Sequence, residues 1–225
     1  MRIQLIVQTL VCYGIVGLVL FGVAGTTHWP GAWIFLIEML AVSLCGGLWL
    51  VEHDRALMAE RLAPPIHKDQ PAADKALLLA VIVASFGTLV VVALDAKRFG
   101  WSSVPLPIEV AGEIILLLGT WFSFRTLAAN SFASPVVKIQ QERGQTVIRT
   151  GPYHYVRHPL YAGALAFFVG ISLLLSSWWG LVAVLVLAVV LGLRIGVEEK
   201  ALRAGLRDYD DYAKDVRYRL IPFIW

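Results

Sequence analysis

Charged residues are scarce in this 225-residue chain. They make up 16% of the sequence, whereas hydrophobic residues make up 58%. A typical soluble domain has about 25% charged and about 45–50% apolar residues, so this composition argues against a soluble protein. It also excludes intrinsic disorder, which requires low hydrophobicity and high net charge. The formal net charge of +3 is too small to indicate a nucleic-acid-binding surface.

The chain also lacks the common motifs of soluble enzymes. Its two cysteines, Cys12 and Cys45, form neither a metal-binding spacing nor a redox motif. Dinucleotide-binding, P-loop and nucleophile-elbow glycine patterns are missing. His154 and His158 have a spacing that suits one helix face, but Pro159 interrupts that helix and no third histidine or cysteine stands nearby. We therefore expect no metal site.

Long apolar segments are abundant instead. A helix that crosses the hydrocarbon core of a bilayer needs about 20 mostly apolar residues. The candidate spans are Ile3–Ala24, Gly31–Val51, Ala76–Leu94, Pro107–Leu127, Leu160–Leu175 and Trp178–Leu193. The last two are short and are separated only by two serines, so they predict a tight helical hairpin. We therefore predict an all-α, polytopic membrane protein with six spans or, alternatively, five.

The positive charges give this topology an orientation. With six spans and a cytoplasmic N-terminus, seventeen of the nineteen Lys and Arg residues, Lys68 among them, lie on the inner side. Only Lys97 and Arg98 lie outside. Because cytoplasmic loops carry an excess of Lys and Arg, we expect a multi-pass protein of the inner or plasma membrane with both termini in the cytoplasm.

Three carboxylates lie in or near predicted spans, namely Glu38, Glu109 and Glu113. Such groups are costly in a membrane and often mark a proton or cation path. No Lys or Arg accompanies them at that depth. We therefore prefer the interpretation that they lie near the outer interface or bond to a neighbouring helix.

Two cytoplasmic segments carry most of the polar information. The first, residues 149–161, is rich in aromatic residues and histidine and leads into the fifth span; Pro159 suits the first position of that helix. His158 then lies at the helix mouth, whose N–H groups attract anions. The second begins where the last span leaves the membrane. There Arg194 and Glu198 are spaced for an intrahelical ion pair, which is worth about 0.3–0.5 kcal/mol.

The two segments together predict a charged cavity below an apolar one, on the cytoplasmic face. Residues 200–220 have the pattern of a C-terminal amphipathic helix. Such a helix either covers the cavity or anchors the chain at the membrane surface.

These segments resemble the isoprenylcysteine carboxyl methyltransferase family and related integral-membrane phospholipid methyltransferases. The matching pieces are Thr150-Gly-Pro-Tyr153, Arg157-His-Pro-x-Tyr161-x-Gly163, Arg194-x-x-x-Glu-Glu199-x-x-Leu202, Tyr209-x-x-Tyr212 and Arg219-Leu-Ile-Pro222. The resemblance implies methyl transfer from S-adenosylmethionine to a lipid-like or prenylated acceptor. It also implies one integral-membrane domain, with N-terminal helices in residues 1–127 and a methyltransferase core in residues 128–225.

Site residues follow from the resemblance position by position. It implies that Gln145, Thr146, Val147 and Ile148 cradle the adenosine end of the donor through their backbone. It implies that the donor is lined by Tyr153, His158, Pro159, Leu160 and Tyr161. Glu198 corresponds to the residue that binds the donor's polar groups, and Arg194 to the arginine that handles the acceptor's carboxylate. A further family glutamine corresponds to Gln140.

The chemistry leaves more than one acceptor open. An ionised carboxylate needs no general base, so Arg194, Glu198 and Glu199 would act through binding and positioning. A phospholipid amine or another small amphiphile would need a base, for which Glu199 or His158 is the first candidate. Membrane sterol reductases share a related fold, but the short chain and the Glu-Glu pair argue against that activity. A non-enzymatic lipid-binding or transport protein is the remaining alternative.

Overall fold

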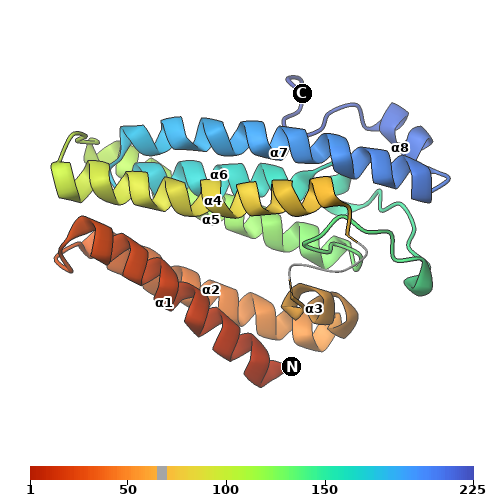
Figure 1. Cartoon of the computed structure of the whole chain (residues 1–225), viewed down its shortest axis with the longest axis horizontal. Helices are drawn as coiled ribbons and strands as arrows, with labels where there is room; N and C mark the ends of the chain where they lie inside the picture. The colour runs from red at the N-terminus through yellow and green to blue at the C-terminus, as the bar shows by residue number, and fades with distance from the viewer. Residues whose placement is uncertain (65–69) are drawn as a thin grey trace.

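The computed structural model describes residues 1–64 and 70–225, and the secondary structure within them is helical. Figure 1 shows the long helices of this fold. Its long apolar helices are α1 (Arg2–Ala24), α2 (Pro30–His53), α4 (Ala72–Ala93), α5 (Leu106–Ala129) and α7 (Trp178–Gly205). A π-helical turn, η1 (Leu94–Phe99), extends α4. The shorter helices are α3 (Arg55–Leu62), α6 (Pro159–Leu174) and α8 (Tyr209–Asp215), with two 3-10 turns, η2 (Gln141–Arg143) and η3 (Gly151–His154).

The predicted all-helical, polytopic fold is therefore confirmed. Within residues 1–64 and 70–225, five helices are long and apolar enough to cross a membrane. Lys68, one of the basic residues expected on the inner side, lies outside the described residues.

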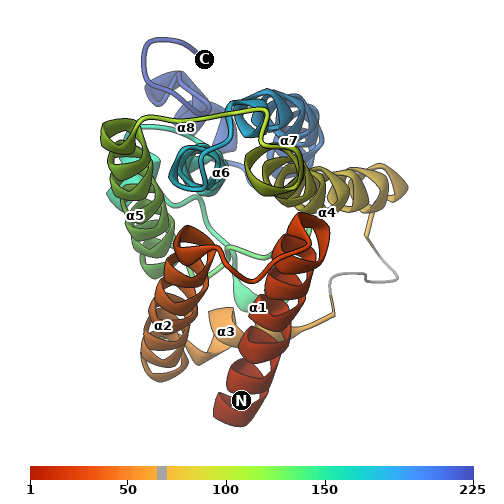
Figure 2. The same cartoon turned by 90° about the vertical axis from the view of Figure 1, so that its left-hand side faces the viewer.

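The helices form a bundle of α4, α5, α6 and α7, with the α1–α2 hairpin against one side (Figure 2). Within the bundle α5 packs on α6 and α4 packs on α7, while α1 contacts both α2 and α4. Glycines allow the close approach of α5 and α6, because a Cβ atom at Gly170 would lie 2.5 Å from the backbone nitrogen of Leu116. Small residues serve this purpose in membrane helix pairs generally.

The predicted α6–α7 hairpin is present. Helix α6 ends at Leu174, and Ser177 caps α7 by accepting a hydrogen bond from the backbone N–H of Gly180 at 2.9 Å. Ser177 also donates to Asp95 in η1 at 2.6 Å, which fixes the turn beside the connection from α4 to α5. Within the described residues five helices have the length and hydropathy of a full span, and α6 is a shorter apolar helix of 16 residues.

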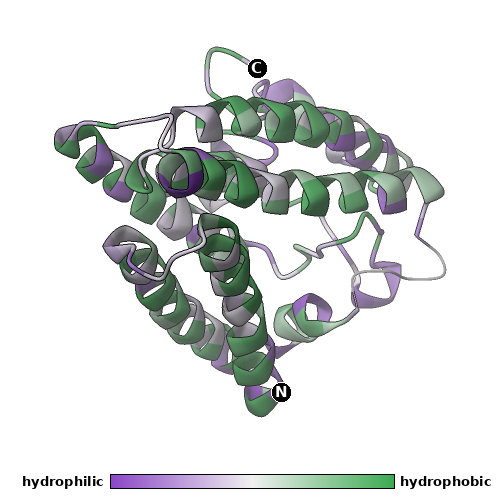
Figure 3. Cartoon of the chain, turned by 60° about the vertical axis from the view of Figure 1, so that its left-hand side comes forward, coloured by the Kyte–Doolittle hydropathy of each residue, from purple (hydrophilic) through white to green (hydrophobic). Residues whose placement is uncertain are grey.

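Polar side chains gather at the end of the bundle opposite η1. Arg2 pairs with Glu52 at 2.7 Å, and Lys138 pairs with Glu60 at 2.6 Å, so the start of α1, the end of α2, α3 and the loop after α5 meet there. Figure 3 shows hydrophobic colour along most of the long helices and hydrophilic colour in the segments at this end. We call it the polar end.

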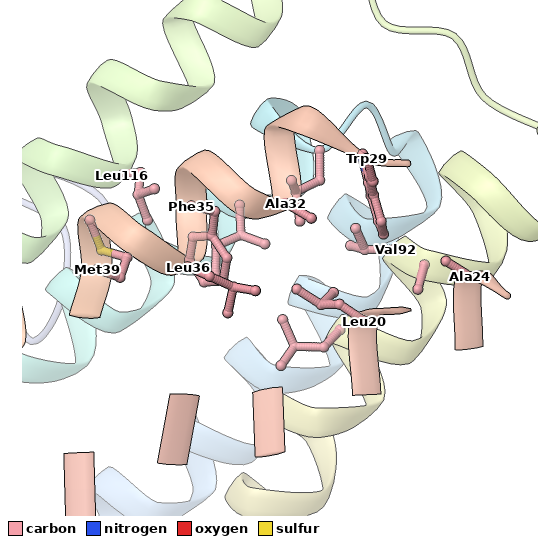
Figure 4. Packing of buried hydrophobic residues seen from close by; sticks show 13 residues of the cluster. Leu20, Ala24, Trp29, Ala32, Phe35, Leu36, Met39, Val92 and Leu116 are labelled. Atoms are coloured by element: carbon pink, nitrogen blue, oxygen red, sulfur yellow. The ribbon is translucent and has the colours of Figure 1, made fainter. Parts of the chain in front are cut away.

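A buried apolar cluster holds the α1–α2 hairpin to the other helices (Figure 4). Leu20 from α1 and Phe35 and Met39 from α2 meet Val92 from α4 and Leu116 from α5, each at most 2% exposed. Close to this cluster, Glu113 of α5 interacts with Glu38 of α2. That contact favours the neighbouring-helix interpretation for Glu38 and Glu113.

Residues 200–220 do not form one continuous amphipathic helix, so that prediction is wrong. Helix α7 continues to Gly205, the chain turns, and the separate short helix α8 follows. A side chain at position 205 would collide with Ile139, so the glycine permits close contact with the loop after α5. The turn lets Tyr209 and Tyr212 point inward, and both are buried.

Candidate functional site

A cavity of about 440 Å³ opens at the polar end, between α4, α5, α6, α7, α8 and the loop from Asn130 to His158. This volume lies within the range of small-molecule pockets, about 300–1,000 Å³. Its apolar wall includes Leu78, Leu127, Leu160 and Ala164, which come from α4, α5 and α6. Its polar wall comes from the loop and from the last turns of α7. The cavity therefore joins a charged region to an apolar one, as the sequence predicts.

The His-Pro turn is held in place by the C-terminal segment. Backbone N–H groups of Arg157 and His158 donate to the carbonyls of Tyr218 and Arg219, each at 2.9 Å. The guanidinium of Arg157 also donates to the carbonyls of Val216 and Arg217 at 2.8 and 3.0 Å. Pro159 begins α6, where its missing N–H costs no hydrogen bond. His158 is thereby fixed at the helix mouth, beside the cavity.

Glu198 and Glu199 are consecutive residues near the end of α7, but their surroundings differ. Glu199 is 5% exposed and accepts hydrogen bonds from Arg157 at 2.8 Å and from Arg219 at 3.0 and 3.1 Å. The ring Nε2 of His158 lies 3.3 Å from the same carboxylate. Glu198 instead lines the cavity, where the hydroxyl of Tyr161 donates to it at 2.7 Å. Glu199 is thus an internal anchor, and Glu198 is the carboxylate that faces the cavity.

Arg194 does not form the intrahelical ion pair that its spacing from Glu198 predicts. Its Nε donates to Asp74 of α4 at 2.9 Å, and its Nη2 donates to the carbonyl of Pro135 at 2.6 Å. Asp74 is fully buried and also accepts from Gln70 at 2.5 Å and from the backbone of Val137 at 3.0 Å. The buried carboxylate of Asp74, which accepts three hydrogen bonds, binds the Arg194 guanidinium more strongly than the partly exposed carboxylate of Glu198 does. The Arg194–Asp74 pair between two helices therefore forms in place of the Arg194–Glu198 pair within α7.

Most of the predicted site residues meet at this cavity. Those that line it are Gln145, Thr146, Val147, Ile148, Tyr153, His158, Pro159, Leu160, Tyr161, Arg194 and Glu198. The Tyr153 hydroxyl accepts a hydrogen bond from Asn130 at 2.8 Å, and burial raises its pKa well above the ordinary value, so it stays neutral.

Two predicted site residues, Gln140 and Glu199, are not among the described residues that line the cavity. Gln140 is fully buried; its amide donates to the carbonyl of Phe132 at 2.9 Å, and its oxygen accepts from Arg143 at 2.5 Å. Its backbone N–H donates to the side chain of Gln145 at 2.7 Å. Gln140 therefore shapes the loop that carries Gln145.

Sequence reasoning missed several residues of the site. Asp74, which anchors Arg194, lies in the first turn of α4, and an acid at the start of a span was its only signal. Arg61 of α3 and Tyr209 of α8 line the cavity as well. The buried hydroxyl of Tyr209 has no hydrogen-bond partner among the described residues. Tyr212 donates to the backbone carbonyl of Tyr153 at 2.8 Å, which ties α8 to the η3 turn.

Comparisons with known proteins agree with this architecture. Residues 108–208 match the family model of phospholipid methyltransferases. Over 135 residues the chain is 33% identical to protein-S-isoprenylcysteine O-methyltransferase of Saccharomyces cerevisiae; the match covers 58% of this chain and 55% of the yeast protein. Over 125 residues it is 36% identical to a probable protein-S-isoprenylcysteine O-methyltransferase of Oryza sativa subsp. indica, covering 55% of this chain and 62% of that protein.

The chain thus spans somewhat more than half the length of the curated relatives it matches. The matched region contains most of α5, all of α6 and α7, and the loop between them, which together form most of the cavity. The resemblance indicated by the sequence motifs is confirmed, because residues 108–208 match the phospholipid methyltransferase family model and the two relatives are named as an isoprenylcysteine O-methyltransferase and a probable one.

Proposed function

We propose that this protein transfers a methyl group from S-adenosylmethionine to the carboxylate of a lipid-like acceptor, as a protein-S-isoprenylcysteine carboxyl O-methyltransferase does. One observation supports this most strongly. The same cavity is lined by the carboxylate of Glu198 and by the buried guanidinium of Arg194, next to an apolar wall formed by α4, α5 and α6. The two charges suit a cationic donor and an anionic acceptor.

The residues of the cavity fit the proposed donor. S-adenosylmethionine, when bound, supplies a methyl group on a positively charged sulfur atom. Glu198 would bind its ammonium group, because charge-assisted hydrogen bonds to carboxylates are the strong ones. Tyr153 and Tyr161 offer aromatic faces, which attract cations. The orphaned hydroxyl of Tyr209 also fits a polar ligand, since buried hydroxyls are almost always hydrogen-bonded.

Arg194 would bind the acceptor. Asp74 and Pro135 occupy Nε and Nη2, and the described residues leave Nη1 without a hydrogen-bond partner. That nitrogen would hold one carboxylate oxygen while the other attacks the methyl carbon. A C–O bond forms, the C–S bond breaks, and no proton moves, so no base is required. Alignment and exclusion of water would then supply most of the rate.

A second acceptor class, the amine of a phospholipid or small amphiphile, has one observation in its favour. Asp74 neutralises the charge of Arg194, which weakens the repulsion of a cationic headgroup. Such an acceptor must lose a proton, and its base would be Glu198 or His158. Glu199 is a poor candidate, because both its oxygens already accept hydrogen bonds from arginine.

The cellular placement is part of the proposal. Among the described basic residues, Lys97 and Arg98 lie in η1, at the end of the bundle away from the cavity. Under the positive-inside rule the polar end, both termini and the cavity face the cytoplasm of the inner or plasma membrane. A C-terminal reporter active only in the cytoplasm should give signal, and a signal from a periplasmic or luminal reporter would reverse the orientation.

Calorimetric titration of the purified protein with S-adenosylmethionine tests the proposed function. The wild type should show one saturable site, and combined Glu198→Ala and His158→Ala substitutions should abolish it. Circular dichroism must show that the double variant keeps its helices. A wild type without saturable binding, or a folded double variant with full affinity, would defeat the proposal.

A further inference from the structure

Helix α3 places an arginine in the cavity wall from outside the family-matched region. Asp54 caps this helix by accepting from the backbone N–H of Leu57 at 2.9 Å. Its buried residues Leu57, Met58 and Leu62 fix which face meets the rest of the protein. Arg61 then lines the cavity, and its Nη1 donates to the carbonyl of Ala133 at 3.2 Å.

Arg61 differs from the other cations of the cavity wall in its pairing. Arg157 pairs with Glu199 at 2.8 Å, Arg194 with Asp74 at 2.9 Å, and Lys138 with Glu60 at 2.6 Å. Within the part of the chain that the structure describes, Arg61 has no carboxylate partner. Glu198 is its counterpart, because within the described residues it forms no ion pair with Lys or Arg, and the ring of His158 lies 3.7 Å from it. Among the described residues, the cavity wall thus carries one arginine without a carboxylate partner and one glutamate without a Lys or Arg partner.

Arg61 and Glu198 both lie close enough to Tyr153 to shift the pKa of its hydroxyl. Arg61 lowers the pKa of the Tyr153 hydroxyl and Glu198 raises it, although burial has the larger effect. Burial also lowers the pKa of Arg61 from its ordinary value, because taking a cation out of water disfavours its charged form. A partly buried guanidinium without a counter-charge is costly, and an anionic ligand would remove that cost.

We propose that Arg61 binds the carboxylate of a ligand in this cavity, opposite Glu198. This inference rests on the proposed function. The amino-acid end of the donor carries one ammonium and one carboxylate, which match Glu198 and Arg61 in sign. The carboxylate of the acceptor is the second possible source, and the two sources are separated by experiment.

The experiment compares the wild type, Arg61→Gln and the matched control Arg55→Gln, which removes an exposed arginine from the same helix. Each full-length protein is titrated in nanodiscs with S-adenosylmethionine and with its decarboxylated analogue. The Michaelis constant for a prenylated cysteine is measured alongside. Arg61→Lys, which keeps the charge, and thermal unfolding of each variant without ligand separate a binding role from a folding defect.

If Arg61 holds the donor, Arg61→Gln should weaken binding of S-adenosylmethionine about 10- to 100-fold, as expected for one charge-assisted contact. The decarboxylated analogue should bind the wild type and the variant equally. If it holds the acceptor, donor affinity should be unchanged and the Michaelis constant should rise about tenfold or more. Arg61→Lys should restore much of the lost affinity.

Unchanged donor affinity together with an unchanged Michaelis constant in a folded Arg61→Gln variant overturns the inference while leaving the proposed function intact. So does an equal loss in Arg55→Gln. A wild type that binds neither donor form overturns the proposed function itself.

Discussion

The Nε atom of Arg194 lies 2.9 Å from Oδ1 of Asp74, although the two residues are 120 positions apart in the sequence. This ion pair joins the first turn of α4 to the part of α7 at the polar end. It fixes one edge of the guanidinium, and the described residues leave Nη1 without a hydrogen-bond partner. The N-terminal half of the chain, outside the matched family region, thus contributes to the candidate site.

Replacing Asp74 with Asn tests the importance of this pair. The change leaves the buried Arg194 without a counter-charge, which typically costs about 3–5 kcal/mol of stability. In thermal unfolding the variant should be clearly destabilised, and its folded fraction should show a raised Michaelis constant for the acceptor with donor affinity retained. The control Asp211→Asn removes an exposed carboxylate paired with Lys214 and should change neither property. Equal behaviour of the two variants would contradict the assigned role of Asp74.

Glu198→Gln tests the binding of the donor's ammonium group. The amide can still accept the hydrogen bond from Tyr161, so unfolding should be unchanged. Loss of the charge should weaken donor binding by about 1.5–3 kcal/mol, or roughly 10- to 100-fold. Calorimetry measures this against Glu142→Gln, an exposed site in η2. Wild-type affinity in Glu198→Gln would remove Glu198 from the site.

Glu199→Gln should behave in the opposite way. Glu199 balances Arg157 and Arg219, so removing its charge should destabilise the protein by about 3–5 kcal/mol and loosen the C-terminal segment. Hydrogen exchange at the backbone amides of Arg157 and His158 should rise, because these amides donate to the carbonyls of Tyr218 and Arg219 in that segment. A variant of normal stability and normal exchange but without activity would instead assign Glu199 a catalytic role.

Tyr209→Phe and Tyr212→Phe form a contrasting pair. The hydroxyl of Tyr212 donates to the Tyr153 carbonyl, so its removal should cost about 0.5–1.5 kcal/mol of stability. The hydroxyl of Tyr209 has no partner among the described residues, so its removal should not lower the stability of the ligand-free protein. If that hydroxyl meets the donor, donor affinity should fall about 3- to 10-fold. Unchanged donor affinity in Tyr209→Phe would exclude the contact.

The helices of this protein were predictable from local sequence. Continuous apolar segments of about 20 residues have one stable arrangement in a bilayer, because only helices satisfy their backbone groups there. The serine pair at positions 176 and 177 marked the α6–α7 hairpin, and Pro159 marked the start of α6. The position of the cavity followed from the family motifs, which surround the same turn.

The pairing of charges was not predictable in the same way. The spacing of four residues indicated a contact between Arg194 and Glu198. Spacing along one helix does not reveal which side chains a helix distant in the sequence places nearby. In the structure Arg194 pairs with Asp74 of α4 instead. Glu198 and Glu199 point about 100° apart around α7, as consecutive helix residues do, so one lines the cavity and the other meets Arg157 and Arg219. Arg61 has no sequence signal, because only the tertiary fold places α3 beside the loop after α5.

Incubation with methyl-labelled S-adenosylmethionine tests the central claim most directly. The protein in nanodiscs is given either a farnesylated cysteine with a free carboxylate, its carboxamide, or phosphatidylethanolamine. The proposed function predicts label only on the first, as a methyl ester that dilute base releases as methanol. Base-stable label on phosphatidylethanolamine, or no transfer to the free carboxylate by protein that binds the donor, would contradict it.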